Sequence, residues 1–191
     1  MLATIFLIIL SAVYWVITPA ALLRFYMQLL SLSFRNPLGQ FVRAVTDWIV
    51  LPLRRIFKGA GYDWASLIAA YFLELTYLFL ASLATTGIAA YSQPLGIVRW
   101  LVSGVFGLAV TVLALMIVTL LVYAVLSWVA RERNAIGDVL AAMVAPWLRP
   151  IRRRMPLIGG IDLSPLVLCV LLQIGIVILQ YSNGALILLI R

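Results

Sequence analysis

Long apolar segments alternate with shorter polar ones along this chain of 191 residues. Residues 1–23, 100–130 and 163–190 contain no charged side chain, and residues 64–98 contain only Glu74. Each segment exceeds the ~20 apolar residues that a helix needs to cross a bilayer. The first has no Lys or Arg ahead of its apolar run and no small-residue cleavage site after it, so we expect a retained span and not a signal peptide. The pattern therefore predicts four transmembrane helices.

Two segments between these spans have the periodicity of amphipathic helices. Apolar residues recur in each at i, i+3, i+4 and i+7, which places them on one helical face. They are Leu38, Phe41, Val42, Val45, Trp48 and Ile49 in the first segment and Ile136, Val139, Leu140, Met143, Val144 and Trp147 in the second. We expect Pro52 and Pro150, each followed by arginines, to end these helices. We expect both helices to lie in the membrane interface with Trp48 and Trp147 as anchors, and packing against the span bundle is the alternative interpretation.

This order of features occurs twice along the chain. The matching pieces are residues 36–43 with 134–141, Pro52-Leu-Arg-Arg with Pro150-Ile-Arg-Arg, and, after a one-residue shift, Glu74 with Gln173. We predict an all-α membrane protein of two tandem repeats, residues 1–92 and 93–191, each made of a span, a cytoplasmic amphipathic helix and a span. Because each unit holds two spans, the second unit starts on the same side of the membrane as the first, and the repeats are parallel.

Positive charge is concentrated around the two amphipathic segments. The chain carries 14 basic and 6 acidic residues, a net charge of +8. Apart from Arg99 and Arg191, the basic residues are Arg24, Arg35, Arg43, Arg54, Arg55 and Lys58 between the first two spans and Arg131, Arg133, Arg149, Arg152, Arg153 and Arg154 between the last two. By the positive-inside rule both basic segments are cytoplasmic, so the predicted topology is N-out and C-out.

The basic residues at the ends of the amphipathic segments are candidate binding residues for anionic lipid headgroups or a partner. The planar fork of arginine binds phosphate groups at two points. The candidates are Arg54, Arg55, Lys58, Arg149, Arg152, Arg153 and Arg154, together with Trp48 and Trp147. The alternative is that these charges only fix the topology. Nucleic acid is not an expected partner, because basic and aromatic residues do not alternate as they do on a base-stacking surface.

A segment rich in turn-forming residues precedes the last span. Gly159 and Gly160 allow a tight turn. Beyond Asp162, the pair Ser164-Pro165 suits the N-cap and the first position of a helix. We therefore expect a sharp re-entry into the membrane here, and in the first unit we expect Asp63 to act as the cap.

These residues resemble the signature of a known family. The run from Asn134 to Gln173, with Pro146-Trp-Leu-Arg-Pro-Ile-Arg-Arg and Gly159-Gly-Ile-Asp-Leu-Ser-Pro, is similar to the YggT family, called YlmG in Gram-positive bacteria and plastids. The first unit departs from the pattern at Trp48 and lacks the glycine-containing run. The resemblance implies a small bacterial inner-membrane protein without an established catalytic activity. It also implies links to septum formation and cell shape, to osmotic shock and potassium handling, and in plastids to nucleoids and cytochrome b6 maturation.

The residue inventory offers little catalytic chemistry. The chain has no histidine, which removes imidazole catalysis and histidine-ligated metals. Its carboxylates are scattered, and it has neither a glycine-rich phosphate motif nor a nucleophile elbow. Its single cysteine, Cys169, lies in an apolar span and is interpreted as a small buried hydrophobe. We therefore expect no enzymatic activity, no metal and no cofactor.

Glu74 is the one ionisable residue well inside a span, where a carboxylate must be protonated, paired or facing water. One interpretation is a cation or proton site lined by Tyr71, Thr76 and Tyr77 and facing Gln173 of the matching span. The other is a neutral acid that hydrogen-bonds the helix bundle together.

The residues support two functional hypotheses. The first is a non-enzymatic scaffold whose amphipathic helices hold the cytoplasmic leaflet and organise the envelope, cell division or the osmotic-stress response. Its expected partners are anionic lipids, envelope or division proteins and further copies of the chain. The second is a channel or transport component for potassium, with Glu74 and Gln173 in a polar path between the two units.

Overall fold

The computed structural model describes residues 1–57, 63–87, 91, 95–129, 135–154 and 162–189. Within these ranges the chain forms helices and no strand. The helices are α1 (Leu2–Leu29), α2 (Pro37–Ile56), α3 (Trp64–Thr85), α5 (Gly96–Val129), α6 (Ala135–Arg152) and α7 (Ser164–Leu189). Four of them, α1, α3, α5 and α7, are long and apolar enough to cross a membrane, which confirms the expectation of four candidate spans.

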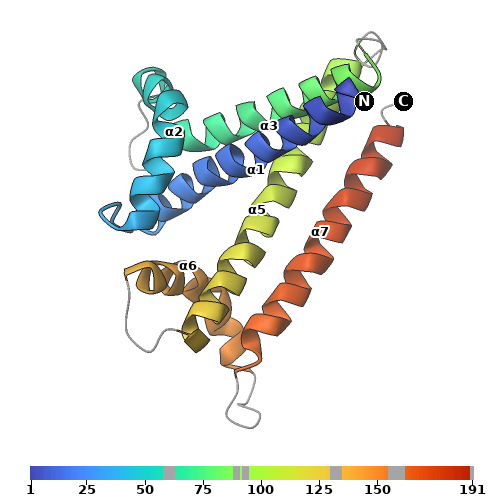
Figure 1. Cartoon of the computed structure of the whole chain (residues 1–191). Coiled ribbons are helices and arrows are strands. Elements are labelled where there is room, and N and C mark those ends of the chain that lie inside the picture. The colour runs from blue at the N-terminus through green and yellow to red at the C-terminus, as the bar shows by residue number, and fades with distance from the viewer. Residues whose placement is uncertain (58–62, 88–90, 92–94, 130–134, 155–161, 190–191) are drawn as a thin grey trace.

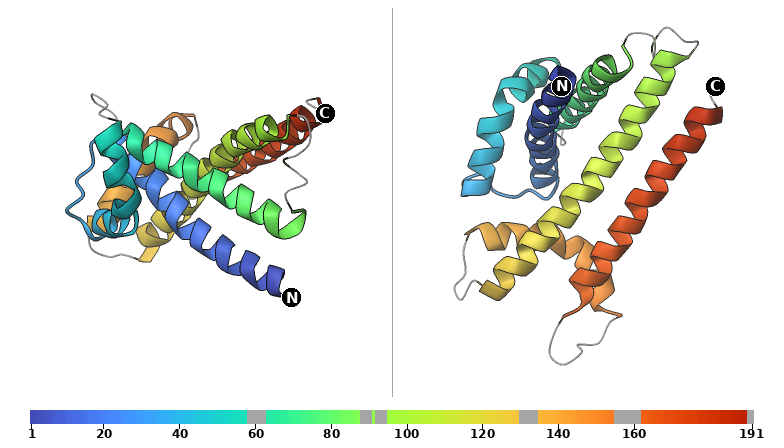
Figure 2. Two further views of the ribbon diagram at one scale, coloured as in Figure 1. Left: turned by 90° about the horizontal axis from the view of Figure 1, so that it is seen from above. Right: turned by 45° about the vertical axis from the view of Figure 1, so that its right-hand side comes forward.

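The spans pack as two antiparallel pairs (Figure 1). α1 lies along α3, α5 lies along α7, and α3 also packs against α5, which joins the pairs. The start of α1 and the end of α7 lie at one end of the molecule, and α2 and α6 lie toward the opposite end (Figure 2). Each amphipathic helix therefore covers the end of one pair of spans, away from the start of α1 and the end of α7.

The spans are apolar around most of their circumference, so they leave large apolar side chains uncovered. Phe72 of α3, Val105 of α5 and Ile178 of α7 are examples in the middle of their helices. A soluble protein would not expose apolar surface on this scale. A helix satisfies its own backbone hydrogen bonds, and lipid chains can therefore cover such side chains without cost.

Local sequence explains where α2 begins. The side chain of Asn36 accepts a hydrogen bond from the backbone N–H of Gly39 at 2.7 Å, and Pro37 occupies the first helical position. A Cβ atom at Gly39 would come within 2.6 Å of the Cα of Phe34, so this turn needs glycine. The cap and the close backbone contact fix the direction in which α2 leaves the loop after α1.

The predicted helix ends at proline are wrong. α2 continues past Pro52 to Ile56, and α6 continues through Pro146 and Pro150 to Arg152. A proline removes one backbone donor, but the residues that follow can still bond backwards, as Phe57 N–H does to Leu53 O at 2.8 Å. The arginines that follow Pro52 and Pro150 therefore begin within the last helical turns and not in a loop.

One face of each amphipathic helix packs on the spans. The buried residues are Gly39, Val42, Thr46 and Val50 in α2 and Leu140, Met143, Val144 and Leu148 in α6. Another apolar side stays uncovered, with Trp48 61% exposed and Trp147 45% exposed. Phe41 in α2 and Ile136 in α6 are exposed as well. The two helices are thus docked on the bundle and still present apolar side chains outward.

Besides the α3–α5 contact, the two halves of the chain also meet where α1, α2 and α6 come together. Leu23 and Met27 of α1 form one buried cluster with Val42 of α2 and Met143 of α6. The hydroxyl of Tyr26 donates to the backbone oxygen of Met143 at 2.7 Å, and the indole N–H of Trp147 donates to that hydroxyl at 3.0 Å. Trp147 therefore links α6 to α1 through this hydrogen bond, although its side chain is partly exposed.

Candidate functional site

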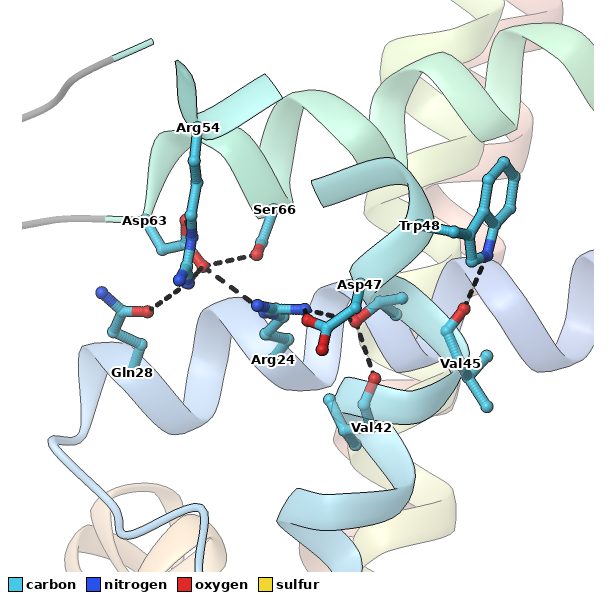
Figure 3. Close-up of polar contacts among 10 residues, drawn as sticks. Arg24, Gln28, Val42, Val45, Asp47, Trp48, Arg54, Asp63 and Ser66 are labelled. Carbon is cyan, nitrogen blue, oxygen red and sulfur yellow. Dashed lines mark hydrogen bonds and ion pairs between the residues drawn. The ribbon is translucent and has the colours of Figure 1, made fainter. Parts of the chain in front are cut away.

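Arg24 lies at the centre of a polar group where α1, α2 and α3 meet. The charge pattern indicated a residue in the loop after the first span, but Arg24 is inside α1 and only 3% exposed. Its Nη1 donates to Asp47 Oδ1 at 2.7 Å and to Thr46 Oγ1 at 2.8 Å (Figure 3). Its Nε lies 3.8 Å from Asp63 Oδ2. A charge at this depth requires such partners, because an unpaired buried guanidinium would be strongly destabilising.

Asp63 links this arginine to the end of α2. It accepts two hydrogen bonds from Arg54, from Nε at 3.1 Å and from Nη2 at 2.5 Å, and one from the Ser66 hydroxyl at 2.5 Å. Asp63 occupies the N-cap position of α3, as expected, but its carboxylate accepts no backbone N–H there and binds Arg54 and Ser66 instead. We call Arg24, Asp47, Arg54 and Asp63 the ion-pair junction.

The charge state of Asp63 follows from these contacts. Burial raises the pKa of this carboxyl, but the hydrogen bonds from Arg54 and Ser66 outweigh burial and hold the pKa below its ordinary value. Asp63 is therefore ionised at neutral pH and stabilises the fold there. This contribution is lost as the pH falls through the lowered pKa of the folded protein.

A polar cavity of about 310 Å³ opens beside the ion-pair junction. It is lined by Arg24, Gln28, Phe34, Arg43, Asp47, Leu51 and Arg54. The guanidinium of Arg43 lies over the Phe34 ring, 4.8 Å from its centroid, which is a cation–π contact. Gln28 accepts a hydrogen bond from Arg54 Nη2 at 3.1 Å and thereby connects α1 to the end of α2. Three arginines from two helices thus share one cavity.

The other predicted basic residues lie in different surroundings. Arg55, Arg149, Arg153 and Arg154 are exposed. Arg152 forms an ion pair with Asp162 at 2.7 Å, which ties the end of α6 to the start of α7. Lys58, Gly159 and Gly160 fall outside the described residues. The structure therefore brings only Arg54, of the predicted arginines, into the ion-pair junction.

The start of α7 uses Asp162 as its acceptor. The predicted cap position of Ser164 is wrong by one residue: Ser164 is the first helical residue and Pro165 the second, so the cap position falls one residue before Ser164. The carboxylate of Asp162 accepts the backbone N–H of Ser164 at 2.9 Å. Burial raises the pKa of Asp162, but the hydrogen bonds from Ser164 and Arg152 hold it below its ordinary value. A negative charge is thus retained at the N-terminus of α7, where the helix dipole favours it.

A second polar group lies inside the bundle around Glu74. This side chain is 3% exposed, and its Oε2 is hydrogen-bonded to the hydroxyl of Tyr14 of α1. The same hydroxyl is 2.6 Å from Thr111 Oγ1 of α5. Glu74, Tyr14 and Thr111 lie on α3, α1 and α5, so this chain of two hydrogen bonds through the Tyr14 hydroxyl connects three spans.

The partners expected for Glu74 are placed elsewhere. Tyr77 contributes only through its ring, which stacks on Tyr14 with centroids 4.2 Å apart. The hydroxyl of Tyr71 donates to Leu101 O, and Thr76 is exposed and donates to Phe72 O. Gln173 is exposed on α7 and makes none of the hydrogen bonds described at Glu74. In the described part of the chain, no three His, Cys, Asp or Glu side chains are close enough to hold a metal ion.

Sequence reasoning missed Arg24 and Asp47 at the junction, Arg43 at the cavity beside it, and Tyr14 and Thr111 inside the bundle. For Arg24 a signal was present, because apolar residues continue on both sides of it and indicate that the helix continues. Tyr14 and Thr111 carry no such signal, since isolated tyrosines and threonines are common in apolar helices.

Four helices long and apolar enough to cross a membrane, with polar groups at their ends and a buried carboxyl between them, indicate a multi-pass membrane protein. The chain belongs to the CCB3/YggT family, whose sequence model matches residues 1–84 and 102–182. The family resemblance seen in the sequence is therefore confirmed.

Similar proteins come from several bacteria. The uncharacterized protein YggT of Escherichia coli strain K12 is 38% identical over 167 residues, which cover 87% of this chain and 84% of that protein. An uncharacterized protein of Vibrio alginolyticus, named for its place in the proC 3′ region, is 36% identical over 154 residues, 80% of each chain. An uncharacterized protein of Haemophilus influenzae is 28% identical over 152 residues, with 79% and 78% covered. No solved structure matches the chain.

Proposed function

We propose that this protein is a non-enzymatic scaffold of the bacterial inner membrane whose helices α2 and α6 bind the surface of the cytoplasmic leaflet. The observation that carries the proposal is the shared build of these helices. Each is docked on the spans by one face, exposes a tryptophan on another side, and has arginines in its last turn. Tryptophan prefers the interface and arginine binds lipid phosphates, so this combination fits the headgroup region of one leaflet.

The proposal includes a topology with both termini outside and both amphipathic helices in the cytoplasm. It also includes two tandem parallel repeats, residues 1–92 and 93–191. The matching of the family's sequence model to a segment in each half supports the repeats. The concentration of basic residues around α2 and α6 supports the orientation.

Single cysteines in an otherwise cysteine-free chain test the topology. Replacing Cys169 by alanine removes the native thiol, after which Ser33→Cys and Thr86→Cys place one thiol at either end of the first pair of spans. We expect a membrane-impermeant maleimide to label the Thr86→Cys protein in intact cells and the Ser33→Cys protein only after permeabilisation. The reverse pattern would contradict the N-out topology.

Quenching of tryptophan fluorescence by brominated lipids tests whether α2 and α6 lie in the membrane interface. Subtracting the signal of a Trp48→Phe/Trp147→Phe protein from that of the wild type isolates these two indoles. We expect bromines near the headgroup to quench the difference signal more than bromines deep in the acyl chains. We also expect brominated anionic lipids to quench it more than brominated neutral lipids. Efficient quenching by iodide in water, with none by brominated lipid, would rule out the interfacial placement.

As its cellular role, we propose that the scaffold organises the envelope, cell division or the osmotic-stress response. Its partners would be anionic lipids, envelope or division proteins and further copies of the chain. Arg153 and Arg154 are exposed and so are accessible to each of these partners. Charge reversal at these two positions should then abolish complementation of a deletion strain, whereas Glu74→Gln should leave it intact.

Transport of potassium is the second candidate function, and the buried carboxyl of Glu74 is the observation in its favour. An acid inside a span is a default functional candidate, because its burial is costly. We expect potassium flux into proteoliposomes under an applied potential to stop in Glu74→Gln and to persist in Thr76→Val, an exposed control on the same helix. Flux that is absent in the wild type, or equal in all three proteins, would remove this candidate.

A further inference from the structure

We infer that the polar cavity beside the ion-pair junction binds the phosphate group of an anionic membrane lipid, with Arg43 supplying the unbalanced positive charge. The inference rests on the proposed function, because it takes α2 to lie at a lipid leaflet. It goes further by naming one binding site, one chemical group and the residues that hold it.

The charged groups around the cavity carry one net positive charge. Asp47 pairs with Arg24, and Asp63 pairs with Arg54. Arg43 is exposed and forms no ion pair among the described residues. Its guanidinium is instead held over the Phe34 ring at the cavity wall. A site with three guanidinium groups and two carboxylates is matched by a ligand that carries one negative charge, as a phosphodiester does.

The paired arginines also have donors to spare. A guanidinium carries five N–H groups. Within the described residues, the hydrogen bonds of Arg24 use Nη1 only, and those of Arg54 use Nε and Nη2. Arg24 Nη2 and Arg54 Nη1 therefore remain for a ligand, and both side chains line the cavity. Their carboxylate partners hold them in place beforehand, which lowers the entropy cost of binding.

The position of the cavity suits a headgroup. Arg24 lies five residues before the last residue of α1, about 7 Å along the helix, and Asp63 directly precedes α3. The cavity is therefore at the depth where spans leave the hydrocarbon core. Phe34 and Leu51 form its apolar walls, and Trp48 points away from the junction on another side of α2 (Figure 3). A lipid can thus place its phosphate against the arginines and its chains beside apolar side chains.

Binding of short-chain lipids to the purified full-length protein in detergent, followed by native mass spectrometry, tests the inference. The probes are dihexanoyl phosphatidylglycerol, dihexanoyl phosphatidylcholine and inorganic phosphate. We expect the anionic lipid to bind most tightly and Arg43→Gln to weaken it by about tenfold or more, as expected for a lost charged hydrogen bond. Arg35→Gln, an exposed arginine outside the cavity lining, should bind as the wild type does. Arg43 has a cation–π contact and no ion pair in the described residues, so its replacement should lower the thermal midpoint only slightly.

Other results would each contradict one part of the inference or of the proposed function. Equal binding by wild type and Arg43→Gln would dismiss the cavity as the site. Inorganic phosphate that binds as tightly as the anionic lipid would make the ligand a free phosphate and overturn the lipid as its source. If Arg43→Gln loses the lipid while Trp48 and Trp147 are quenched only from water, the cavity stands and the scaffold proposal fails. If brominated lipid quenches these indoles and Arg43→Gln binds lipid as the wild type does, the scaffold proposal stands and the cavity is not the site.

Discussion

Arg24→Leu is expected to lower the free energy of unfolding by about 3 kcal/mol, which is the lower end of the range for removing one partner of a buried ion pair. The loss leaves Asp47 without its 2.7 Å partner and removes a positive charge 3.8 Å from Asp63. Asp63 keeps Arg54, and Asp47 is 42% exposed, so water compensates part of the loss. Unfolding by sodium dodecyl sulfate in mixed micelles, followed by circular dichroism, measures the change.

Two further variants make the Arg24 prediction specific. Arg35→Leu removes an exposed arginine near the start of α2 and should change stability by less than about 0.5 kcal/mol. Adding Asp47→Leu to Arg24→Leu removes the uncompensated carboxylate, so the double variant should be more stable than the sum of the single changes predicts. Equal stability of Arg24→Leu and Arg35→Leu would mean that the ion-pair junction does not hold α1, α2 and α3 together.

The spans and the amphipathic helices were predictable because their signals are local. An uninterrupted apolar run and an i, i+3, i+4 pattern describe a helix and its environment without reference to other segments. The helix ends were less predictable, as Pro52 shows. The proline rule describes an isolated helix, whereas α2 is packed on the spans through Val50 and keeps its last turn beyond Pro52.

The polar contacts were not predictable, because they join distant segments. Sequence reasoning paired Glu74 with neighbours on its own helix and with Gln173, its counterpart in the repeat. The structure gives it Tyr14 instead, whose hydroxyl also contacts Thr111, and these contacts depend on how α1 and α5 are rotated against α3. Arg24 is similar, since its helical context was readable but its acidic partners were not. Residue type identified the groups that needed a partner, and packing decided which partner each received.

Gly107→Ala is expected to destabilise the protein by about 1–3 kcal/mol, the range for overpacking a tight site. A Cβ atom at Gly107 would overlap Glu74 Oε1, so the carboxyl group must move. The end of a free glutamate could rotate away at little cost. Here the carboxyl is buried and bonded to Tyr14, so its movement breaks a contact that joins α1 and α3. Thermal unfolding in detergent, followed by circular dichroism, measures the change in stability.

Gly184→Ala is the matched control, because apart from its own chain neighbours and the backbone of its own helical turns, no described atom lies within 4 Å of a Cβ built at this position of α7. It should leave stability unchanged or raise it slightly, since alanine favours helix over glycine. In a Glu74→Ala background the obstructing carboxyl is gone, so Gly107→Ala should cost little there, which a double-mutant cycle measures. If Gly107→Ala cost the same with and without Glu74, its effect would come from α5 itself. If Gly107→Ala destabilises the wild type but not the Glu74→Ala protein, the destabilisation comes from displacement of the Glu74 carboxyl. The hydrogen bond between Glu74 and Tyr14 then requires that position 107 has no side chain.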